Sequence, residues 1–244
     1  MTTIFTITRD QIISGALRKL QVLELGATPD ADTVTNAYTS LNVMIKAWQT
    51  QGIKLWTIKN YSLPLVAAQN LYRIGNSPVS PTVVMDMTTD KPLKVIQSFL
   101  RNISVTPNID TPTQTLSRQE YNILGSKSAT GQINSVWYDP RTTYGEVHTY
   151  LTPDATIAAN FQLVLVCQIP LSDLTLAADI PDFPQEWLQA MIWGLADELA
   201  IEYGCHINQR QEIAMKANKY RDDLEGWDTE TASTFFQVDT RNQR

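Results

Sequence analysis

Two histidines and two cysteines are the residues of this chain best suited to acid–base, nucleophilic or metal chemistry. His148 lies in a short β-branched run and His206 follows a predicted helix, so each is either a general base or an ordinary surface or helix-end histidine. Cys167 and Cys205 have no CxxC spacing, and two isolated His and two isolated Cys lack the spacing of a four-ligand zinc site. We expect both cysteines to be reduced and buried.

Sequence signatures of the common catalytic and nucleotide-binding sites do not occur in this chain. It contains no HExxH, GxSxG, GxGxxG or Walker A pattern, each of which arranges residues around a metal, an acyl group or a phosphate. We therefore expect a protein that is not an enzyme and that needs neither a metal nor a cofactor.

Charge is distributed unevenly along the 244 residues, whose formal net charge is −6. Residues 1–141 hold 13 Lys and Arg against nine Asp and Glu, residues 142–209 hold none against nine, and residues 210–244 hold six against seven. Phosphate binding needs basic side chains that release counterions. The segment without Lys or Arg therefore argues against a protein that wraps nucleic acid.

Two features near the C-terminal end of the sequence leave alternatives open. A predicted helix carries four acids, which form a solvated polar face in the ordinary interpretation: Glu186, Asp197, Glu198 and Glu202. Further on, the apolar residues Phe235, Phe236 and Val238 interrupt a Thr-, Asp- and Gln-rich segment. Either they pack back on the protein itself, or they form an anchor that becomes ordered against a partner.

The composition is that of a folded soluble protein. With 43% hydrophobic and 18% charged residues, the chain is too apolar for intrinsic disorder. No apolar run approaches the ~18–20 residues that cross a bilayer. The first residues lack the basic region and apolar core of a signal peptide, so we expect synthesis in the cytoplasm.

The N-terminal part of the chain shows helical periodicity. We expect a first helix over residues 8–25, opened by a capping box of Thr8 and Gln11. A second helix over residues 28–52, with Thr28 as its N-cap, follows after a short connection. Such a connection predicts an antiparallel hairpin of the two helices.

The middle of the chain changes to short β-branched and aromatic runs, separated by Pro, Gly, Asn and Thr. The expected strands are 55–63, 71–74, 83–87, 93–100, 133–138, 146–151 and 161–167. We expect residues 106–115 to be an exposed loop and residues 117–124 to be a short helix with a second capping box. Helices return over residues 184–203 and 208–227.

These elements predict an α+β fold in which the two ends of the chain form the larger part. Residues 1–52 and 171–228 would make a helical bundle formed by the N- and C-terminal helices. Residues 53–170 would be an inserted antiparallel β lobe, and residues 229–244 an extended C-terminal tail.

The order of several short fragments resembles that of a known protein family. The fragments are LNVMIKAWQTQGIKLWT, SRQEY, VWYDP, YLTPD, DFPQEW and LADELAIEYG. Over residues 8–230 the chain is similar to the head-to-tail adaptors of short-tailed bacteriophages, the tail tubular protein A and packaged-DNA stabilisation connectors.

The resemblance implies a structural virion protein at the junction of head and tail. Twelve copies would form a ring beneath the portal protein, extend the channel for double-stranded DNA and attach the tail nozzle or fibre proteins. The four helix acids would then line a channel through which DNA passes without binding. The two phenylalanines and Val238 would dock the tail segment onto the portal.

A different class of function stays open beside this one. The chain could be a β-sandwich binding module of a phage tail, for carbohydrate or protein, that uses Trp137, Tyr138, Tyr144 and Tyr150. The spacing of these aromatics fits the core alternation of strands equally well.

Overall fold

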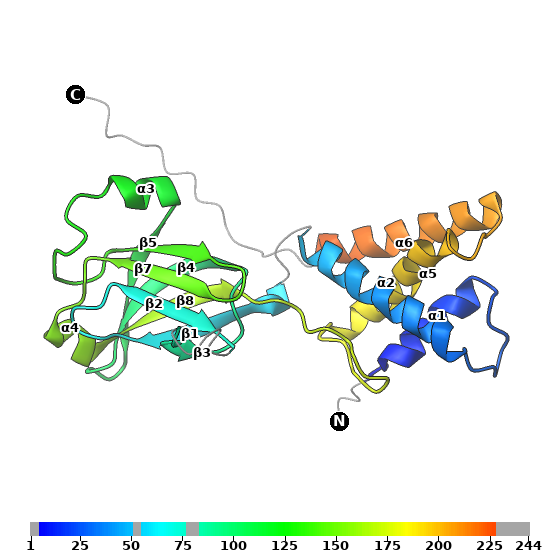
Figure 1. Cartoon of the computed structure of the whole chain (residues 1–244), viewed down its shortest axis with the longest axis horizontal. Coiled ribbons are helices and arrows are strands. Elements are labelled where there is room, and N and C mark those ends of the chain that lie inside the picture. The colour runs from blue at the N-terminus through cyan, green and yellow to red at the C-terminus, as the bar shows by residue number, and fades with distance from the viewer. Residues whose placement is uncertain (1–4, 51–54, 77–82, 228–244) are drawn as a thin grey trace. The chain divides into compact units, whose positions relative to one another are not determined.

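The computed structural model describes residues 5–50, 55–76 and 83–227. The chain divides into two compact units (Figure 1). Residues 1–41 and 176–244 form one, called here the helical unit, and residues 42–175 form the other, the β unit.

The β unit is built on one sheet of eight strands in the order β1–β8–β4–β5–β6–β7–β2–β3. The strands are β1 (Ile58–Pro64), β2 (Leu71–Gly75), β3 (Met87–Thr88), β4 (Lys94–Asn102), β5 (Ile109–Leu116), β6 (Ser135–Pro140), β7 (Gly145–Tyr150) and β8 (Phe161–Gln168). The short helical segment η1 (Leu55–Thr57) precedes β1, and two short helices lie between strands: α3 (Arg118–Ile123) and α4 (Ala155–Asn160).

This sheet corrects the predicted fold class. Within the described residues the protein is a mixed α/β structure dominated by an eight-stranded, nearly closed, barrel-like sheet, accompanied by six α-helices. The prediction of an α+β helical bundle with an inserted antiparallel β lobe is therefore wrong. The sheet is the larger element, and two of its adjacent strand pairs, β2–β3 and β5–β6, are parallel.

The main physical reason for the error is strand β5, which occupies most of the segment predicted to be a loop. Between Ile109 and Leu116 it has no large apolar residue, and almost all of its residues are exposed, so the sequence shows no apolar alternation. Backbone pairing holds it instead, antiparallel to β4 and then parallel to β6. Pro112 pairs with Phe99 of β4 before the pairing with β6 begins at Gln114, so the missing N–H of the proline breaks no bond to β6.

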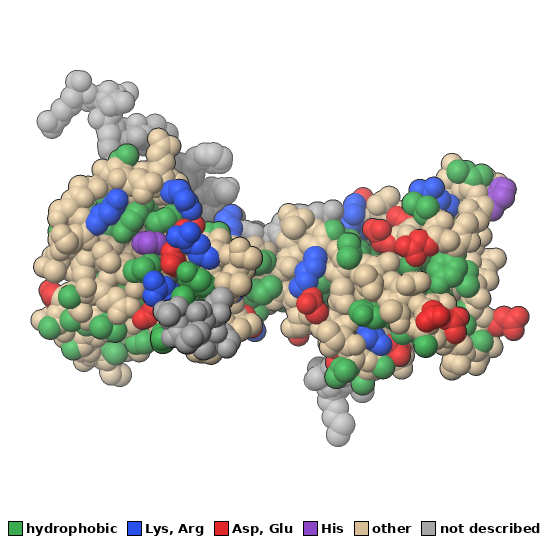
Figure 2. All heavy atoms as spheres, in the orientation of Figure 1, with side chains coloured by type: hydrophobic (Ala, Val, Ile, Leu, Met, Phe, Trp, Pro, Cys, Tyr) green, Lys and Arg blue, Asp and Glu red, His purple; other side chains and the backbone are tan. Residues whose placement is uncertain are grey.

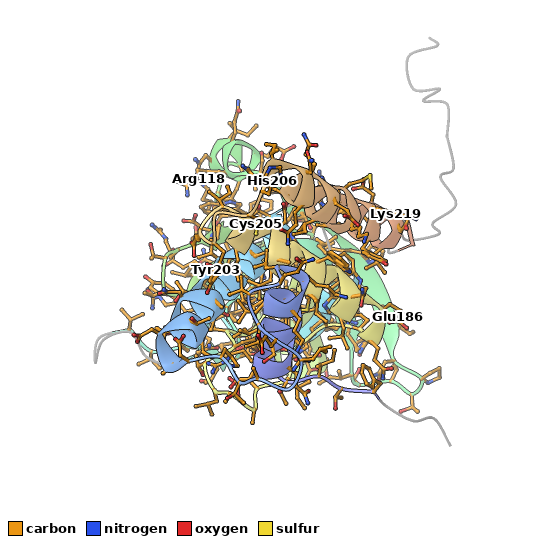
Figure 3. All side chains as sticks on the ribbon, turned by 90° about the vertical axis from the view of Figure 1, so that its right-hand side faces the viewer. Arg118, Glu186, Tyr203, Cys205, His206 and Lys219 are labelled. Atoms are coloured by element: carbon orange, nitrogen blue, oxygen red, sulfur yellow. The ribbon has the colours of Figure 1, made fainter. Side chains whose placement is uncertain are left out.

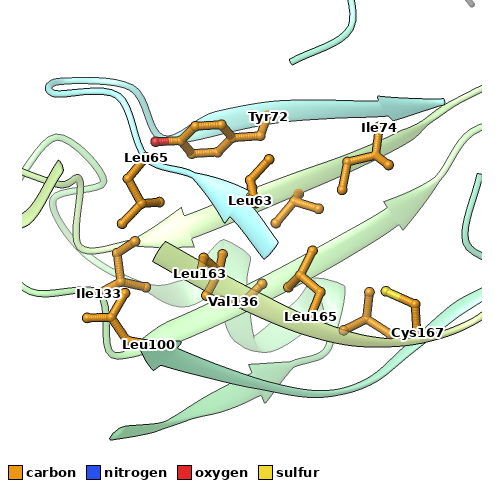
Figure 4. Close-up of a cluster of buried hydrophobic side chains, with 12 residues drawn as sticks. Leu63, Leu65, Tyr72, Ile74, Leu100, Ile133, Val136, Leu163, Leu165 and Cys167 are labelled. Atoms are coloured by element: carbon orange, nitrogen blue, oxygen red, sulfur yellow. The ribbon is translucent and has the colours of Figure 1, made fainter. Parts of the chain in front are cut away.

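A buried cluster fills the space between the strands of the β unit (Figure 4). Its members are Leu63, Leu65, Tyr72, Ile74, Val95, Leu100, Ile133, Val136, Val147, Leu163, Leu165 and Cys167. The alternation of side chains along a strand places every second residue on this inner face. The buried Tyr72 hydroxyl donates to the Gln69 carbonyl at 3.0 Å and accepts from the Val66 N–H at 3.1 Å, so it brings no unpaired polar group into the core.

Position 145, the first residue of β7, requires glycine because a neighbouring ring lies too close for a side chain, and not because of its backbone angles. The Tyr138 ring of β6 lies over it, and a Cβ at position 145 would overlap this ring. The Tyr138 hydroxyl donates to the Pro92 carbonyl, which holds the ring in place. A side chain at position 145 would therefore force apart two adjacent strands of the sheet.

The helical unit has its own core, made by three helices packed in series. The helices of the chain outside the sheet region are α1 (Arg9–Lys19), α2 (Ala31–Thr50), η2 (Gln185–Trp187), α5 (Leu188–Ala200) and α6 (Ile207–Trp227). Helix α1 packs against α5, and α5 packs against α6. Helix α1 takes α5 as its main helix partner, with Gly15 against the Ile192 side chain. It also contacts α2, where the Arg9 guanidinium lies 5.2 Å from the centroid of the Tyr38 ring, and the expected antiparallel hairpin of α1 and α2 stays a prediction.

Local capping signals were predicted correctly at one of the first two helices. The capping box of Thr8 and Gln11 is confirmed, with the Thr8 N–H donating to Gln11 Oε1 at 2.9 Å. At α2 the predicted N-cap Thr28 is wrong, since the Asp30 carboxylate accepts the Thr33 N–H at 2.7 Å. This hydrogen bond is the main cause that lowers the pKa of Asp30.

None of the helices in the described ranges combines the length and the apolar character that a bilayer crossing requires.

Candidate functional site

Charged and aromatic side chains form two rows across β6, β7 and β2, on the face opposite the buried cluster. The strand register aligns Trp137 with His148, and two residues further along it aligns Asp139 with Glu146 and Arg73. The intervening residues of β6 and β7 pack into the buried cluster or against it. Strand alternation alone therefore gathers these five side chains on one outer face.

Three rings stack at one end of these rows. The Trp137 and His148 rings are nearly parallel, with centroids 4.4 Å apart and an interplanar angle of 23°. Tyr121 covers both from α3, at 5.1 Å from Trp137 and 5.4 Å from His148. Tyr121 is only 5% exposed, so this contact holds α3 on the sheet.

Helix α3 is positioned by a local signal that the sequence predicted. The capping box of Ser117 and Glu120 is confirmed: the Ser117 N–H donates to Glu120 Oε2 at 2.7 Å, and the Glu120 N–H donates to Ser117 Oγ at 3.3 Å. The two bonds fix the start of the helix. They orient Arg118 and Tyr121 towards the rows of β6 and β7.

The environment of His148 favours the neutral imidazole. Burial is the main cause that lowers its pKa below the ordinary value of 6.5, and the positive charges of Arg141 and Lys127 lower it further. The carboxylates of Glu146 and Asp139 oppose this shift. The Nε2 atom of His148 has no hydrogen-bond partner among the described residues and lies 3.9 Å from Glu146 Oε2. We therefore treat His148 as an uncharged stacking ring at neutral pH.

Two buried carboxylates hold three guanidinium groups at the surface. Asp139 Oδ1 accepts from Arg118 Nη2 at 2.6 Å, and Asp139 Oδ2 lies 3.1 Å from Arg141 Nε. Arg141 Nη2 donates to Glu146 Oε2 at 2.9 Å, and Arg73 Nε lies 3.7 Å from Glu146 Oε1. The carboxylate side chains are 6% and 9% exposed, while those of Arg118 and Arg141 are 65% and 52% exposed. The acids anchor the three arginines, and the Arg118 and Arg141 side chains stay more than half exposed.

Two cations also lie over the stacked rings. The Arg118 guanidinium is 5.3 Å from the Trp137 ring centroid, and the Lys127 ammonium is 5.0 Å from the Tyr121 centroid. Figure 2 shows hydrophobic, basic and acidic side chains gathered together on one face of the β unit. We call this surface the basic–aromatic patch; its members are Arg73, Arg118, Tyr121, Lys127, Trp137, Asp139, Arg141, Glu146 and His148.

The patch is suited to binding anions. Its four basic side chains outnumber its two carboxylates, so it is net positive while His148 is neutral. Each guanidinium has five N–H donors, and the buried acids use only some of them. Anchored guanidinium groups recognise carboxylate and phosphate groups well because their donors are already oriented. Within the described ranges, no group of three or more His, Cys, Asp or Glu is arranged to hold a metal ion.

The structure places the four predicted acids in η2, in α5 and in the turn that follows α5. Asp197 lies near Arg210 and Arg221 of α6, which lower its pKa, although burial has the larger effect and raises it. Glu198 is exposed in the last turn of α5, and Glu202 is exposed in the turn that follows the helix. Glu186 is exposed in η2, and Figure 3 labels it at one end of α5, with Cys205 and His206 in the turn after the other end.

The other residues named in the predictions differ in what the structure says of them. The apolar tail residues Phe235, Phe236 and Val238 lie outside the described residues. The four aromatics of the binding-module alternative do not form one platform, because Tyr138 packs against the buried cluster while Trp137 belongs to the patch on the opposite face. Both cysteines are free; Cys167 is buried and Cys205 is partly exposed.

Sequence reasoning missed the ionic part of the patch. Arg118 and Asp139 are 21 residues apart in the chain, and Arg141 and Glu146 come from either side of a turn. The available signal was the polar residues that alternate with core residues in SVWYDP and GEVHTY. Without the register of β6 and β7, nothing indicated that these polar residues face each other.

No protein-family model matches this chain. No curated protein shows significant sequence similarity to it.

Proposed function

We propose that this protein is a head-to-tail adaptor of a short-tailed bacteriophage. It is a structural virion protein that forms a ring of twelve copies beneath the portal, extends the DNA channel and attaches the tail nozzle and fibres. The proposal starts from the order of the sequence fragments described above, and the surface of the helical unit supports it.

The observation that carries the proposal is an exposed apolar end of the helical unit. The Gln209 side chain donates to the Leu20 carbonyl at 3.1 Å, so the turn after α1 adjoins the turn between α5 and α6. Exposed apolar side chains occur in both turns and at the first residue of α6: Val22 46%, Leu25 93%, Ile201 64% and Ile207 59% exposed. Grouped apolar side chains of this kind usually mark a protein–protein contact. A subunit of a closed ring needs such surfaces.

The charge of the helical unit is compatible with a channel for DNA. This unit holds nine Lys and Arg against 17 Asp and Glu in the sequence, a net charge of −8. Like charges on the wall and on the phosphates prevent tight binding, which lets DNA slide past. Of the acids predicted to line the channel, Glu186, Glu198 and Glu202 are exposed and Asp197 is partly covered.

The tail segment supplies the proposed contact with the portal. Phe235 and Phe236 with Val238 are the apolar residues of an otherwise polar stretch, and aromatic side chains dominate the energy of many interfaces. Deletion of residues 229–244 tests this step. Loss of binding to the portal ring is expected, and unchanged binding would refute the assignment.

The apolar end is tested by charged substitutions in the full chain. Leu25→Asp combined with Ile207→Asp should prevent ring completion on a purified portal ring, measured by sedimentation velocity. The matched control is Ile109→Asp, since Ile109 of the β unit is 60% exposed and Ile207 is 59% exposed. Equal portal loading by both variants would remove the main support for the proposal.

The alternative, a carbohydrate- or protein-binding module of a phage tail, would use the basic–aromatic patch. Its ring faces are already occupied by one another and by Arg118 and Lys127, which leaves little open aromatic surface for a sugar. Binding of the isolated chain to a glycan array, lost on Trp137→Ala, would favour this function over the adaptor.

A further inference from the structure

The two units of the chain carry opposite net charges. The β unit holds ten Lys and Arg against eight Asp and Glu, a net charge of +2, beside the −8 of the helical unit; together they give the −6 of the whole chain. A ring closes through heterologous contacts, in which two different surfaces of the same chain meet. Opposite charge on the two units supplies a pair of surfaces suited to such a contact.

The positive partner of this pair is the basic–aromatic patch. Arg118 contacts one oxygen of the Asp139 carboxylate and Arg141 contacts the other, so their guanidinium groups lie close together. Both side chains are more than half exposed, and Lys127 lies nearby over Tyr121. The patch therefore presents closely spaced cationic groups whose positions are fixed before any ligand arrives, which lowers the entropy cost of binding.

The negative partner is the end of α5. Glu198 and Glu202 are both exposed, and neither makes an ion pair within the described part of the chain. Glu198 lies in the last turn of α5, and Glu202 lies in the turn that follows the helix. Ile201, 64% exposed, directly precedes Glu202. These two carboxylates, with an apolar side chain next to them in the sequence, suit the adjacent guanidinium groups and rings of the patch.

We propose that the basic–aromatic patch of one copy binds Glu198 and Glu202 of a second copy. The contact rests on the proposed ring, because it supplies the heterologous interface that a ring requires. It places these two acids between subunits rather than on the channel wall, and leaves Glu186 available for the channel.

A nucleic acid fits the patch less well than a second copy does. The rings of Tyr121, Trp137 and His148 stack on one another, so no pair of open ring faces is offered to bases. Two carboxylates lie within the patch, and the whole chain is negative. The two carboxylates of Glu198 and Glu202 carry less negative charge than a continuous phosphate backbone and therefore meet less repulsion.

Zero-length carbodiimide cross-linking gives the direct test, because it joins a lysine only to a carboxylate in contact with it. An equal mixture of unlabelled and ¹⁵N-labelled full chains is cross-linked alone and on the portal ring, then analysed by mass spectrometry. We expect Lys127 joined to Glu198 or Glu202 in peptides of mixed label. Absence of such peptides in both samples, while other cross-links between copies form, would overturn the proposal.

Complementary variants provide the second test. Arg118→Glu with Lys127→Glu removes the positive surface, and Glu198→Lys with Glu202→Lys removes the negative one. The association constant for self-association of each variant alone should be at least about tenfold lower than that of the parent chain, as expected for a contact between charged surfaces. The mixture should recover paired copies, because one intact surface of each kind remains. The control is Arg101→Glu, which reverses the charge of an arginine of β4 that pairs with Asp110 of β5. This variant should self-associate like the parent chain.

The outcomes separate this proposal from the adaptor function. If the patch variant keeps its native circular dichroism, caps the portal in rings and self-associates like the parent chain, the contact is refuted and the adaptor function survives. If the parent chain shows the mixed-label cross-link but does not bind the portal ring, the contact between copies is supported and the adaptor function is refuted. Retention of the parent chain on a DNA duplex, lost only in the patch variant, would assign the patch to nucleic acid and refute the contact.

Discussion

Replacement of Asp139 by Asn tests whether the buried carboxylates hold the basic–aromatic patch together. The substitution keeps the size of the side chain and removes the charge that binds Arg118 at 2.6 Å and Arg141 at 3.1 Å. The Asp139 side chain is only 6% exposed, so water reaches the new amide poorly. One carboxylate, that of Glu146, would remain to hold the arginines.

The expected loss follows from the two contacts and their exposure. A hydrogen bond to a charged group contributes about 1.5–3 kcal/mol to stability when it is shielded from water. Both arginine side chains are more than half exposed, so solvent replaces much of each contact. Because of this screening, we expect Asp139→Asn to lower the free energy of unfolding of the β unit by about 1–3 kcal/mol in total.

Urea denaturation followed by circular dichroism, with peptide-level hydrogen exchange over β6 and β7, measures this loss. Hydrogen exchange separates the β unit from the helical unit, which need not unfold in the same step. The matched control is Asp110→Asn, whose carboxylate pairs with Arg101 at 2.8 Å, with both side chains at least one-third exposed. A loss for Asp139→Asn no larger than that of the control would refute the anchoring role of the buried acid.

Three further predictions concern the packing and chemistry of single residues. Gly145→Ala should destabilise the β unit by about 1–3 kcal/mol in denaturant titrations because its methyl overlaps the ring above it, whereas Gly125→Ala, with open space around it, should not. Because the pKa of His148 is lowered in the folded state, the contribution of this residue to stability is complete above pH 6.5 and falls as the pH drops towards the folded pKa. The melting temperature of the parent chain should therefore fall more from pH 7.5 to 5.5 than that of His148→Gln. Burial raises the pKa of Cys167 to about 12, so a thiol reagent should modify Cys205 alone in the native protein and both cysteines in denaturant; fast native labelling of Cys167 would contradict its burial.

Local signals made parts of the fold predictable from sequence. The capping boxes of Thr8 with Gln11 and of Ser117 with Glu120 need only residues three apart, and both are present. The helix predicted from the apolar periodicity of residues 184–203 is present as α5, and its buried residues recur along one broad face.

Non-local pairing made the sheet and the site unpredictable. Strand β5 is polar on both faces and exists through hydrogen bonds to β4 and β6, which leave no trace in its own hydrophobic pattern. The ionic part of the patch depends on the register that aligns Asp139 with Glu146. A shift of one residue would turn these acids towards the core, so their pairing is a property of the whole sheet.

The mass and symmetry of the protein, alone and with a portal ring of the same phage, test the central claim most directly. Light scattering gives the mass, and negative-stain microscopy gives the symmetry. The adaptor function predicts twelvefold rings that cap the portal. A persistent monomer that ignores the portal would contradict it and would favour a ligand-binding role for the β unit.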